Sequence, residues 1–204
     1  MVVVVDYGLG NLRSVLGAVD KLGFTGRISD DQGDIKSATH LILPGVGAFG
    51  DGMANLETRG LTGALHEAVI ERRTPVLGIC LGAQLLTRDS DEFGSHRGLG
   101  WIPASVRRIV TSDPSLRVPH VGWNALQQRR PLSLFAGVPD GALFYFVHSY
   151  HIVCDDPETA AGECHYGSAM TAVIHHDNVY GTQFHPEKSQ LHGLTVLKNF
   201  LTLA

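Results

Sequence analysis

Short, continuous apolar runs alternate with helical patterns through the first half of the chain. The apolar runs are Val2–Val5, Leu41–Leu43 and Val76–Ile79, and helical patterns cover about residues 11–22 and a stretch that ends near Arg73. Strands that are covered on both faces of a sheet have continuous apolar sequences, whereas half-exposed strands alternate apolar and polar residues. The order of strand and helix therefore predicts parallel βαβ units in an α/β fold.

The second half of the chain has a different pattern, with short apolar segments close together. These candidate strands are Phe144–Val147, Ile152–Cys154, Met170–Ile174 and Val179–Phe184. They predict extra antiparallel strands in the C-terminal half, beside a mostly parallel central sheet flanked by helices.

The chain is expected to end in a helix. Leucines recur at helical spacing from Glu187 onward, at positions 191, 194, 197 and 201, and we expect them to pack on the sheet. The stretches Asp89–Gly98 and Gln127–Pro131 have the polar composition of exposed loops. No repeat or linker interrupts the pattern, which predicts one α/β domain over residues 1–204.

The composition narrows the possible functions. With 44% hydrophobic residues, 18% charged residues and a net charge of -4, the chain resembles an ordinary soluble globular protein and shows no basic excess for nucleic acid. No apolar stretch approaches the roughly 20 residues that cross a bilayer. The three cysteines, Cys80, Cys154 and Cys164, form no Cys-x-x-Cys pair and are odd in number. They disfavour a disulfide framework and a thiolate metal cage, so we expect a cytoplasmic protein with no metal, no cofactor and no membrane partner.

A nucleophilic cysteine is the first candidate for chemistry. In PVLGICLGAQLL an apolar strand runs into a predicted helix, and Gly78 and Gly82 stand two residues on either side of Cys80. This is a Gly-x-Cys-x-Gly version of the nucleophile elbow, in which glycines permit a tight strand-to-helix turn. A helix N-terminus favours the thiolate, and the N–H group of Leu81 would face the oxyanion of a tetrahedral intermediate. The alternative is a small buried cysteine at the end of a strand.

The candidate base is His185, chosen from eleven histidines by its context. It ends an apolar run and precedes Pro186, which favours an extended conformation, and Glu187 two residues on would point to the same side. The carboxylate would fix the tautomer of the imidazole and stabilise the imidazolium. The alternative is a plain strand-to-helix boundary in which Glu187 interacts with the helix N-terminus.

Two glycine-rich loops complete the candidate chemistry. In LPGVGAF, which ends at Phe49, Gly45 and Gly47 would let backbone N–H groups face a reacting carbonyl, as the second half of an oxyanion hole. A phosphate-binding loop is the alternative for this segment and for DYGLGN. Neither segment has the Gly-Lys-Ser/Thr of a P-loop, and Arg13 stands where a dinucleotide-binding motif has its third glycine.

These motifs resemble those of the class I glutamine amidotransferases, in which an oxyanion loop like PGVG, an elbow like GICLG and a distant His-Pro-Glu follow in this order. The segments DYGLGNLRSV, GLGW, VPHVGWN, YFVHSY and GTQFHPEKS resemble more closely the glutaminase subunits of imidazole glycerol phosphate synthases. The resemblance covers the chain from end to end. It implies hydrolysis of glutamine to glutamate and ammonia, which a synthase subunit uses to make imidazole glycerol phosphate and an aminoimidazole carboxamide ribonucleotide in histidine biosynthesis.

The resemblance also assigns residues to roles. It implies a catalytic triad of Cys80, His185 and Glu187, an oxyanion hole at Val46, Gly47 and Leu81, and glutamine binding by Gly45 and Gln84. It further implies a heterodimer with a cyclase barrel subunit, whose interface includes Asn11, Trp123, Tyr145 and Lys188.

Two positions depart from the pattern of this family. Ala83 stands where methionine is frequent, and Ala104 where glycine is common; both concern local packing rather than the reaction. Three other functions compete: an amidotransferase subunit of anthranilate, guanylate or pyridoxal phosphate synthesis, a cysteine hydrolase that acts alone, and a non-enzymatic interaction module. The VPHVGWN segment disfavours the first, and the elbow together with His-Pro-Glu disfavours the last.

Overall fold

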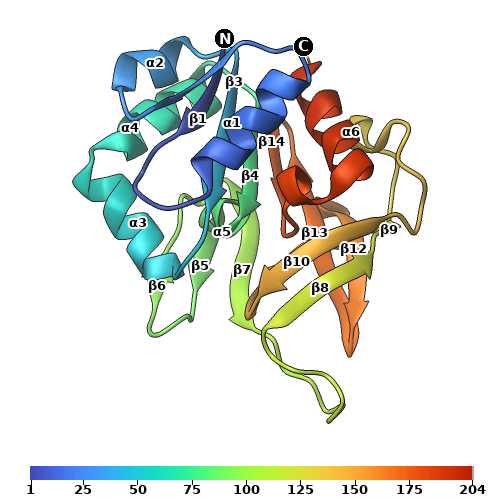
Figure 1. The fold of residues 1–204 in the computed structure, drawn as a ribbon. Coiled ribbons are helices and arrows are strands. Elements are labelled where there is room, and N and C mark those ends of the chain that lie inside the picture. The colour runs from blue at the N-terminus through green and yellow to red at the C-terminus, as the bar shows by residue number, and fades with distance from the viewer. Residues whose placement is uncertain (204) are drawn as a thin grey trace.

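A mixed twelve-stranded sheet runs through the protein, with helices on both of its faces (Figure 1). The computed structural model describes residues 1–203. Neighbouring strands along the sheet follow the order β2-β1-β3-β4-β14-β13-β11-β7-β5-β6. The parallel part consists of β1 (Val2–Val5), β2 (Gly26–Ser29), β3 (His40–Gly45), β4 (Val76–Cys80) and β14 (Val179–Thr182).

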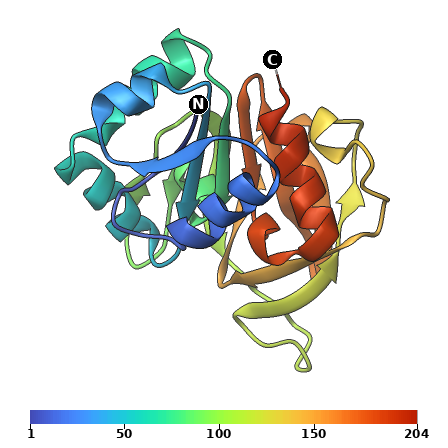
Figure 2. The same ribbon diagram turned by 45° about the horizontal axis from the view of Figure 1, so that its top comes forward.

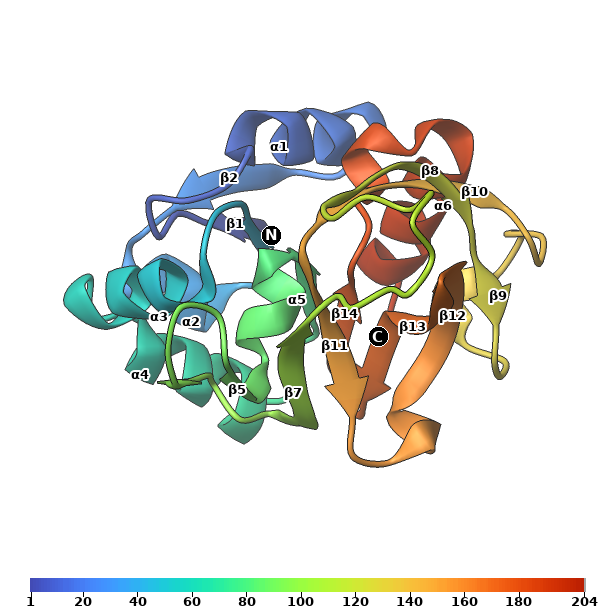
Figure 3. The ribbon, with the colours of Figure 1, turned by 90° about the horizontal axis from the view of Figure 1, so that it is seen from below.

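The rest of the sheet is mostly antiparallel. It contains β13 (Ser168–His176), β11 (Tyr150–Cys154), β7 (Ile102–Arg108), β12 (Ala160–Tyr166), β9 (Gln127–Gln128), β6 (His96–Arg97) and β5 (Thr87–Ser90), of which β5 pairs with β7 in parallel. Two further strands, β8 (His120–Ala125) and β10 (Leu143–His148), form a separate antiparallel ribbon. Seen from below, this ribbon crosses the α6 side of the sheet (Figure 3).

Helices cover the two faces of the sheet in separate groups. The helices α1 (Leu12–Lys21) and α6 (Gln190–Leu201) lie side by side on one face (Figure 2). The other face carries α2 (Gln32–Ser37), α3 (Phe49–Thr58), α4 (Leu61–His66), which continues as a π-helical segment (Glu67–Glu71), and α5 (Leu81–Leu85). Short 3-10 turns occupy Ser133–Phe135, Pro157–Thr159 and Pro186–Lys188.

The burial of β1 on both of its faces explains why its sequence is continuously apolar. Val2 and Val4 belong to the core beneath α1 and α6, whereas Val3 and Val5 belong to the core beneath α2, α3 and α4. Successive side chains of a strand point to opposite faces, so a strand with two covered faces needs an apolar residue at every position. The predicted mostly parallel sheet with added antiparallel strands is confirmed.

Some predicted boundaries are wrong. The segment Asp89–Gly98 is not a plain loop, because it contains the end of β5 and all of β6, and Gln127–Pro131 begins with β9. The strands β5 and β6 pair with each other within the first segment, whereas β9 pairs with the distant strand β12, and local composition reveals neither pairing. None of the helices within residues 1–203 is both long enough and apolar enough to cross a membrane.

The terminal helix also begins later than expected. Glu187 lies in a 3-10 turn, and α6 begins at Gln190. Leu197 and Leu201 are buried, but Leu191 is 73% exposed and does not pack on the sheet. At 3.6 residues per turn Leu191 lies about 120° around the helix from Leu197, which turns it away from the core.

Candidate active site

A sharp turn between β4 and α5 places Cys80 at the end of a buried strand. Cys80 has φ 55° and ψ -110°, a strained backbone conformation for a residue other than glycine. A Cβ atom on Gly82 would overlap the carbonyl oxygen of Leu43, and one on Gly78 would lie 2.6 Å from the Cα atom of Ala83. The glycine spacing thus gives the predicted strand–turn–helix, because only glycines let these backbones come so close.

The helix that follows Cys80 is short. The five residues of α5 cannot build a long helix dipole, so the free N–H groups of its first turn provide the polar environment around the thiol. Ala83, which departs from the family pattern, lies fully buried in this helix.

The segment after β14 carries His185 and Glu187. His185 is extended, with φ -96° and ψ 97°, and its Nδ1 atom lies 2.9 Å from Oε1 of Glu187. Their side chains are 3% and 1% exposed. The His185 backbone N–H group donates to the carbonyl oxygen of Tyr145 at 2.9 Å, and the Ser189 hydroxyl donates to the His185 carbonyl oxygen at 2.6 Å. Hydrogen bonds therefore hold both the backbone N–H group and the carbonyl group of His185.

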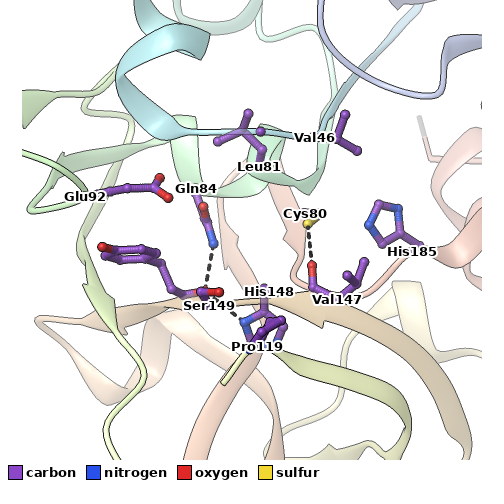
Figure 4. Close-up of a pocket in the computed structure, with 12 residues that line it drawn as sticks. Val46, Cys80, Leu81, Gln84, Glu92, Pro119, Val147, His148, Ser149 and His185 are labelled. Atoms are coloured by element: carbon purple, nitrogen blue, oxygen red, sulfur yellow. Dashed lines mark hydrogen bonds between the residues drawn. The ribbon is translucent and has the colours of Figure 1, made fainter. Parts of the chain in front are cut away.

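The imidazole lies beside the thiol (Figure 4). Burial alone lowers the pKa of His185, but the interactions with the Cys80 sulfur and the Glu187 carboxylate outweigh burial and raise this pKa to about 9. Within residues 1–203 the Nε2 atom of His185 has no hydrogen-bond partner, and the Cys80 thiol donates instead to the Val147 carbonyl oxygen at 3.8 Å. Such contacts are often loose before substrate binds.

A cavity of about 320 Å³ opens over these groups, at the small end of the range for ligand sites (Figure 4). Its lining residues are Val46, Gly47, Cys80, Leu81, Gln84, Glu92, Pro119, Val147, His148, Ser149, Tyr150 and His185. The structure thus brings together at one cavity the predicted nucleophile, base, oxyanion-hole residues and one of the two predicted glutamine-binding residues.

The other predicted glutamine-binding residue, Gly45, does not line the cavity. It ends β3 opposite Cys80, where a Cβ atom would overlap the Tyr7 hydroxyl and lie 2.8 Å from Cβ of Leu81. The lack of a side chain lets the loop and the elbow touch, which places Val46 and Leu81 on the same cavity. Gly45 therefore contributes close packing in this structure, and its part in glutamine binding stays a prediction.

The Gln84 side chain is held in one orientation. Its Nε2 atom donates to the carbonyl oxygen of Tyr150 at 2.9 Å and to Oε1 of Gln183 at 3.0 Å. A carbonyl oxygen can only accept, so the nitrogen of the amide must face Tyr150. Both amide hydrogens are used, and the Gln84 oxygen is left as an acceptor.

Glu92 is a cavity residue that the sequence does not single out. Its Oε2 atom accepts from the Phe49 N–H group at 2.7 Å, which brings the polar loop after β5 to the start of α3. It is the one carboxylate among the residues that line the cavity. Glu92 lies in a stretch with several charged residues, and no motif distinguishes it from them.

The four predicted interface residues lie near the same end of the molecule. The rings of Trp123 and Tyr145, cross-strand neighbours in the β8–β10 ribbon, are 6.0 Å apart, and the Lys188 ammonium lies 5.9 Å from the centre of the Tyr145 ring. Trp123 is 46% exposed and so is not a core aromatic. Asn11 is exposed just before α1, which packs against the turn Pro186–Lys188.

Residues 3–204 match the family described as glutamine amidotransferase class-I. The chain belongs to the class I glutamine amidotransferase family, as its motifs predict. Within this family it is similar to the imidazole glycerol phosphate synthase subunit HisH of Moorella thermoacetica, with 49% identity over 199 residues that cover 98% of this chain and 93% of that protein. It is 45% identical over 203 residues to HisH 2 of Pseudomonas aeruginosa, with both chains covered in full.

Solved structures show the same fold at lower identity. PurLQS from Thermotoga maritima aligns with a TM-score of 0.76 at 20% identity, covering 98% of this chain and 96% of that chain. A glutamine amidotransferase from Thermotoga maritima aligns with a TM-score of 0.67 at 14% identity, covering 98% of this chain and 95% of that chain. At these identities the likeness concerns the fold alone.

Proposed function

We propose that this chain hydrolyses glutamine through Cys80, His185 and Glu187 and supplies the ammonia to an imidazole glycerol phosphate synthase in histidine biosynthesis. The observation that carries the proposal is the shared cavity, where a strained elbow cysteine faces a histidine that a buried carboxylate holds at 2.9 Å. The similarity to HisH subunits over nearly the whole chain supports the choice of synthase.

The first half of the reaction forms a thioester. The Cys80 thiolate attacks the amide carbon of the glutamine side chain, and the carbonyl oxygen becomes an oxyanion beside the backbone of Val46, Gly47 and Leu81. The carbon–nitrogen bond then breaks as His185 gives its proton to the leaving nitrogen. Its raised pKa keeps this proton on the imidazole at neutral pH.

The second half of the reaction releases glutamate. His185, now neutral, takes a proton from a water molecule that attacks the thioester carbon, and the carbon–sulfur bond breaks to restore the thiolate. Glu187 keeps the Nδ1 hydrogen in place throughout, so that Nε2 is the nitrogen that exchanges protons.

Two polar side chains suit the ends of a glutamine substrate. The Gln84 oxygen accepts a hydrogen bond from a substrate N–H group because both of its own amide hydrogens are used. The Glu92 carboxylate forms an ion pair with the α-ammonium group.

An exposed apolar surface supports the proposal of a synthase partner. Trp123, Leu143 and Leu191, which are 46%, 51% and 73% exposed, line a hollow of about 560 Å³ between the ribbon and the start of α6. Exposed apolar patches of this kind mark interaction sites. Ammonia that escapes into neutral water becomes ammonium and loses its nucleophilicity, so a docked partner is needed to receive it.

The test separates glutamine hydrolysis from synthase activity. Cys80→Ala should abolish glutamine hydrolysis, while its complex with the synthase subunit still makes product from added ammonium salt. Cys154→Ala is the matched control: this half-buried thiol lies outside the cavity, and burial raises its pKa to about 11. Glutamine hydrolysis by Cys80→Ala at the wild-type rate would disprove the proposed nucleophile.

A further inference from the structure

Two buried histidines face each other across the β8–β10 ribbon. His120 and His148 are cross-strand partners, 3% and 7% exposed, and Nδ1 of His120 lies 3.0 Å from Nε2 of His148. The His120 ring is stacked between Phe146 and Tyr166, with ring centres 4.9 and 4.1 Å away. The reaction steps above use neither histidine, and only His148 lines the cavity.

The hydrogen bonds of this pair have a fixed direction. Nδ1 of His148 lies 2.8 Å from the carbonyl oxygen of Tyr150, which can only accept, so this nitrogen carries a hydrogen. In a neutral imidazole the other nitrogen, Nε2, is then an acceptor. Nδ1 of His120 must therefore donate to it, which leaves Nε2 of His120 as an acceptor in turn.

The far end of the chain of hydrogen bonds agrees with this direction. The Asn124 amide nitrogen lies 3.3 Å from Nε2 of His120 and donates to the carbonyl oxygen of His165 at 2.9 Å. The orientation of this amide is set by its oxygen, which accepts from the Ala125 N–H group at 2.8 Å. Each hydrogen bond, from Asn124 on β8 to His148 in the wall of the cavity, then has one donor and one acceptor.

Burial keeps both rings neutral. It lowers the pKa of His120 to about 4 and that of His148 to about 3. A proton on Nε2 of His148 would reverse the first link and set a donor of His120 against the Asn124 amide nitrogen. The neutral state is therefore the one in which all the hydrogen bonds form together.

At the cavity, the same carbonyl oxygen holds Gln84. Tyr150 accepts both from His148 and from the Gln84 amide, and Gln84 also donates to Gln183, whose Nε2 atom lies 3.8 Å from the Cys80 sulfur. The two bonds fill the two lone pairs of the Tyr150 carbonyl oxygen. The orientation of the Gln84 amide in the cavity wall thus depends on a carbonyl oxygen that also accepts from His148 (Figure 4).

We propose that His120 is a positioning residue for glutamine hydrolysis, which acts through His148 and the Tyr150 carbonyl to hold the Gln84 amide in its substrate-binding orientation. This inference rests on the proposed glutaminase function. It assigns a role to a side chain that does not line the cavity and lies on the same strand as the exposed Trp123.

Two substitutions separate hydrogen bonding from packing. His120→Phe keeps an aromatic ring between Phe146 and Tyr166 but removes the donor to His148. His120→Asn keeps an N–H donor near the place of Nδ1 but removes the ring. His175→Phe is the control, because His175 also lies against a tyrosine ring, at 4.5 Å from Tyr180, but lines no part of the active-site cavity.

The measurement is kcat and KM for glutamine, made on the full chain by itself and in complex with its synthase partner. His120→Phe should lower kcat/KM by about 2- to 12-fold, the fold-change that corresponds to one hydrogen bond, with the larger part in KM. His120→Asn should stay closer to the wild type, and His175→Phe should match it. The reverse order of the two His120 variants would show that stacking matters and would overturn the inference.

Nitrogen-15 NMR of the wild-type histidine rings tests the same inference without any variant. Both His120 and His148 should carry hydrogen on Nδ1 and none on Nε2; hydrogen on either Nε2 would overturn it. A wild-type chain that has no glutaminase activity either alone or in the complex would disprove the proposed function itself. An active wild type with an unchanged kcat/KM in His120→Phe would overturn only the positioning role.

Discussion

Two neighbours of His185, Cys80 and Glu187, let this histidine keep its proton to a higher pH. Without a charged neighbour, burial would lower the pKa of this histidine, but its pKa is raised to about 9. The protonated form is therefore the one stabilised in the fold, and it is lost as the pH increases through about 9. We expect kcat/KM for glutamine to decline over that range, since this ratio reports groups of the free enzyme.

Glu187→Gln tests the part of this pKa shift that the Glu187 carboxylate causes. The glutamine can still accept from Nδ1 but carries no charge, so the pKa of His185 should fall and the alkaline decline of kcat/KM should move to lower pH. Glu57→Gln removes an exposed carboxylate on α3 and serves as the control. The two pH profiles should differ; an identical alkaline limb in wild type and Glu187→Gln would show that the carboxylate does not set this pKa.

Gly82 is the residue at which the elbow is least tolerant of change. Gly82→Ala would press a methyl group against the carbonyl oxygen of Leu43, and it should lower the free energy of unfolding by about 1–3 kcal/mol through overpacking. Glutaminase activity should fall with it, because the same contact fixes Cys80.

Gly17→Ala is the matched control for this substitution. Gly17 lies on the exposed side of α1 with nothing within 4 Å of an added Cβ atom, so alanine there should stabilise the protein by about 0.4–1 kcal/mol. Urea unfolding measures both changes. Equal stabilities of the two variants would contradict the close approach of β3 to the elbow.

Sequence patterns predicted the helices and strands that local composition encodes. Both ends of the strand Val2–Val5 were predicted correctly, because apolar residues cover each of its faces. The helix α1 lies within the predicted helix. The elbow was predictable because glycines at fixed spacing have a local cause. His185 and Glu187 come together because they are only two positions apart, where the extended chain at His185 enters the 3-10 turn that carries Glu187.

Contacts between distant segments explain what the sequence did not predict. Glu92 reaches the cavity through its hydrogen bond to Phe49, 43 positions away, and β9 exists because it pairs with β12. The close packing at Gly45 involves Tyr7, which comes from another strand end. Such pairings depend on the tertiary fold, and no periodicity in one segment encodes them.

The first turn of α6 gives a prediction at this scale. Leu191→Ser should change the free energy of unfolding by no more than about 0.5 kcal/mol, because its side chain is largely exposed. Leu197→Ala, on the same helix but fully buried, should cost about 2–5 kcal/mol. Urea denaturation of both variants is the measurement, and a large loss from Leu191→Ser would mean that this turn packs on the core after all.

Across the whole molecule, the β8–β10 ribbon connects the cavity to the exposed apolar surface. One end of the ribbon carries His120, His148 and the cavity wall, and its middle carries Trp123 and Tyr145. A partner that docks on the ribbon would therefore contact an element that also shapes the glutamine site. This arrangement would suit the proposed transfer of ammonia to an acceptor enzyme.

The indole of Trp123 should dominate the affinity for the synthase subunit. It is large and half-exposed, and it packs edge-on against the Tyr145 ring, as the anchor residues of interfaces typically pack against neighbours. Trp123→Ala should weaken the complex by at least about 2 kcal/mol, or roughly 30-fold in Kd, while the isolated variant unfolds like the wild type.

Val153→Ala is the control, since Val153 is similarly exposed, at 42%, but lies on β11 outside the ribbon. Titration calorimetry with the purified synthase subunit measures both values. Equal Kd values for the two variants would place the docking surface elsewhere, whereas a selective loss in Trp123→Ala, with ammonia transfer falling in parallel, would tie partner binding to the ribbon that forms the glutamine site.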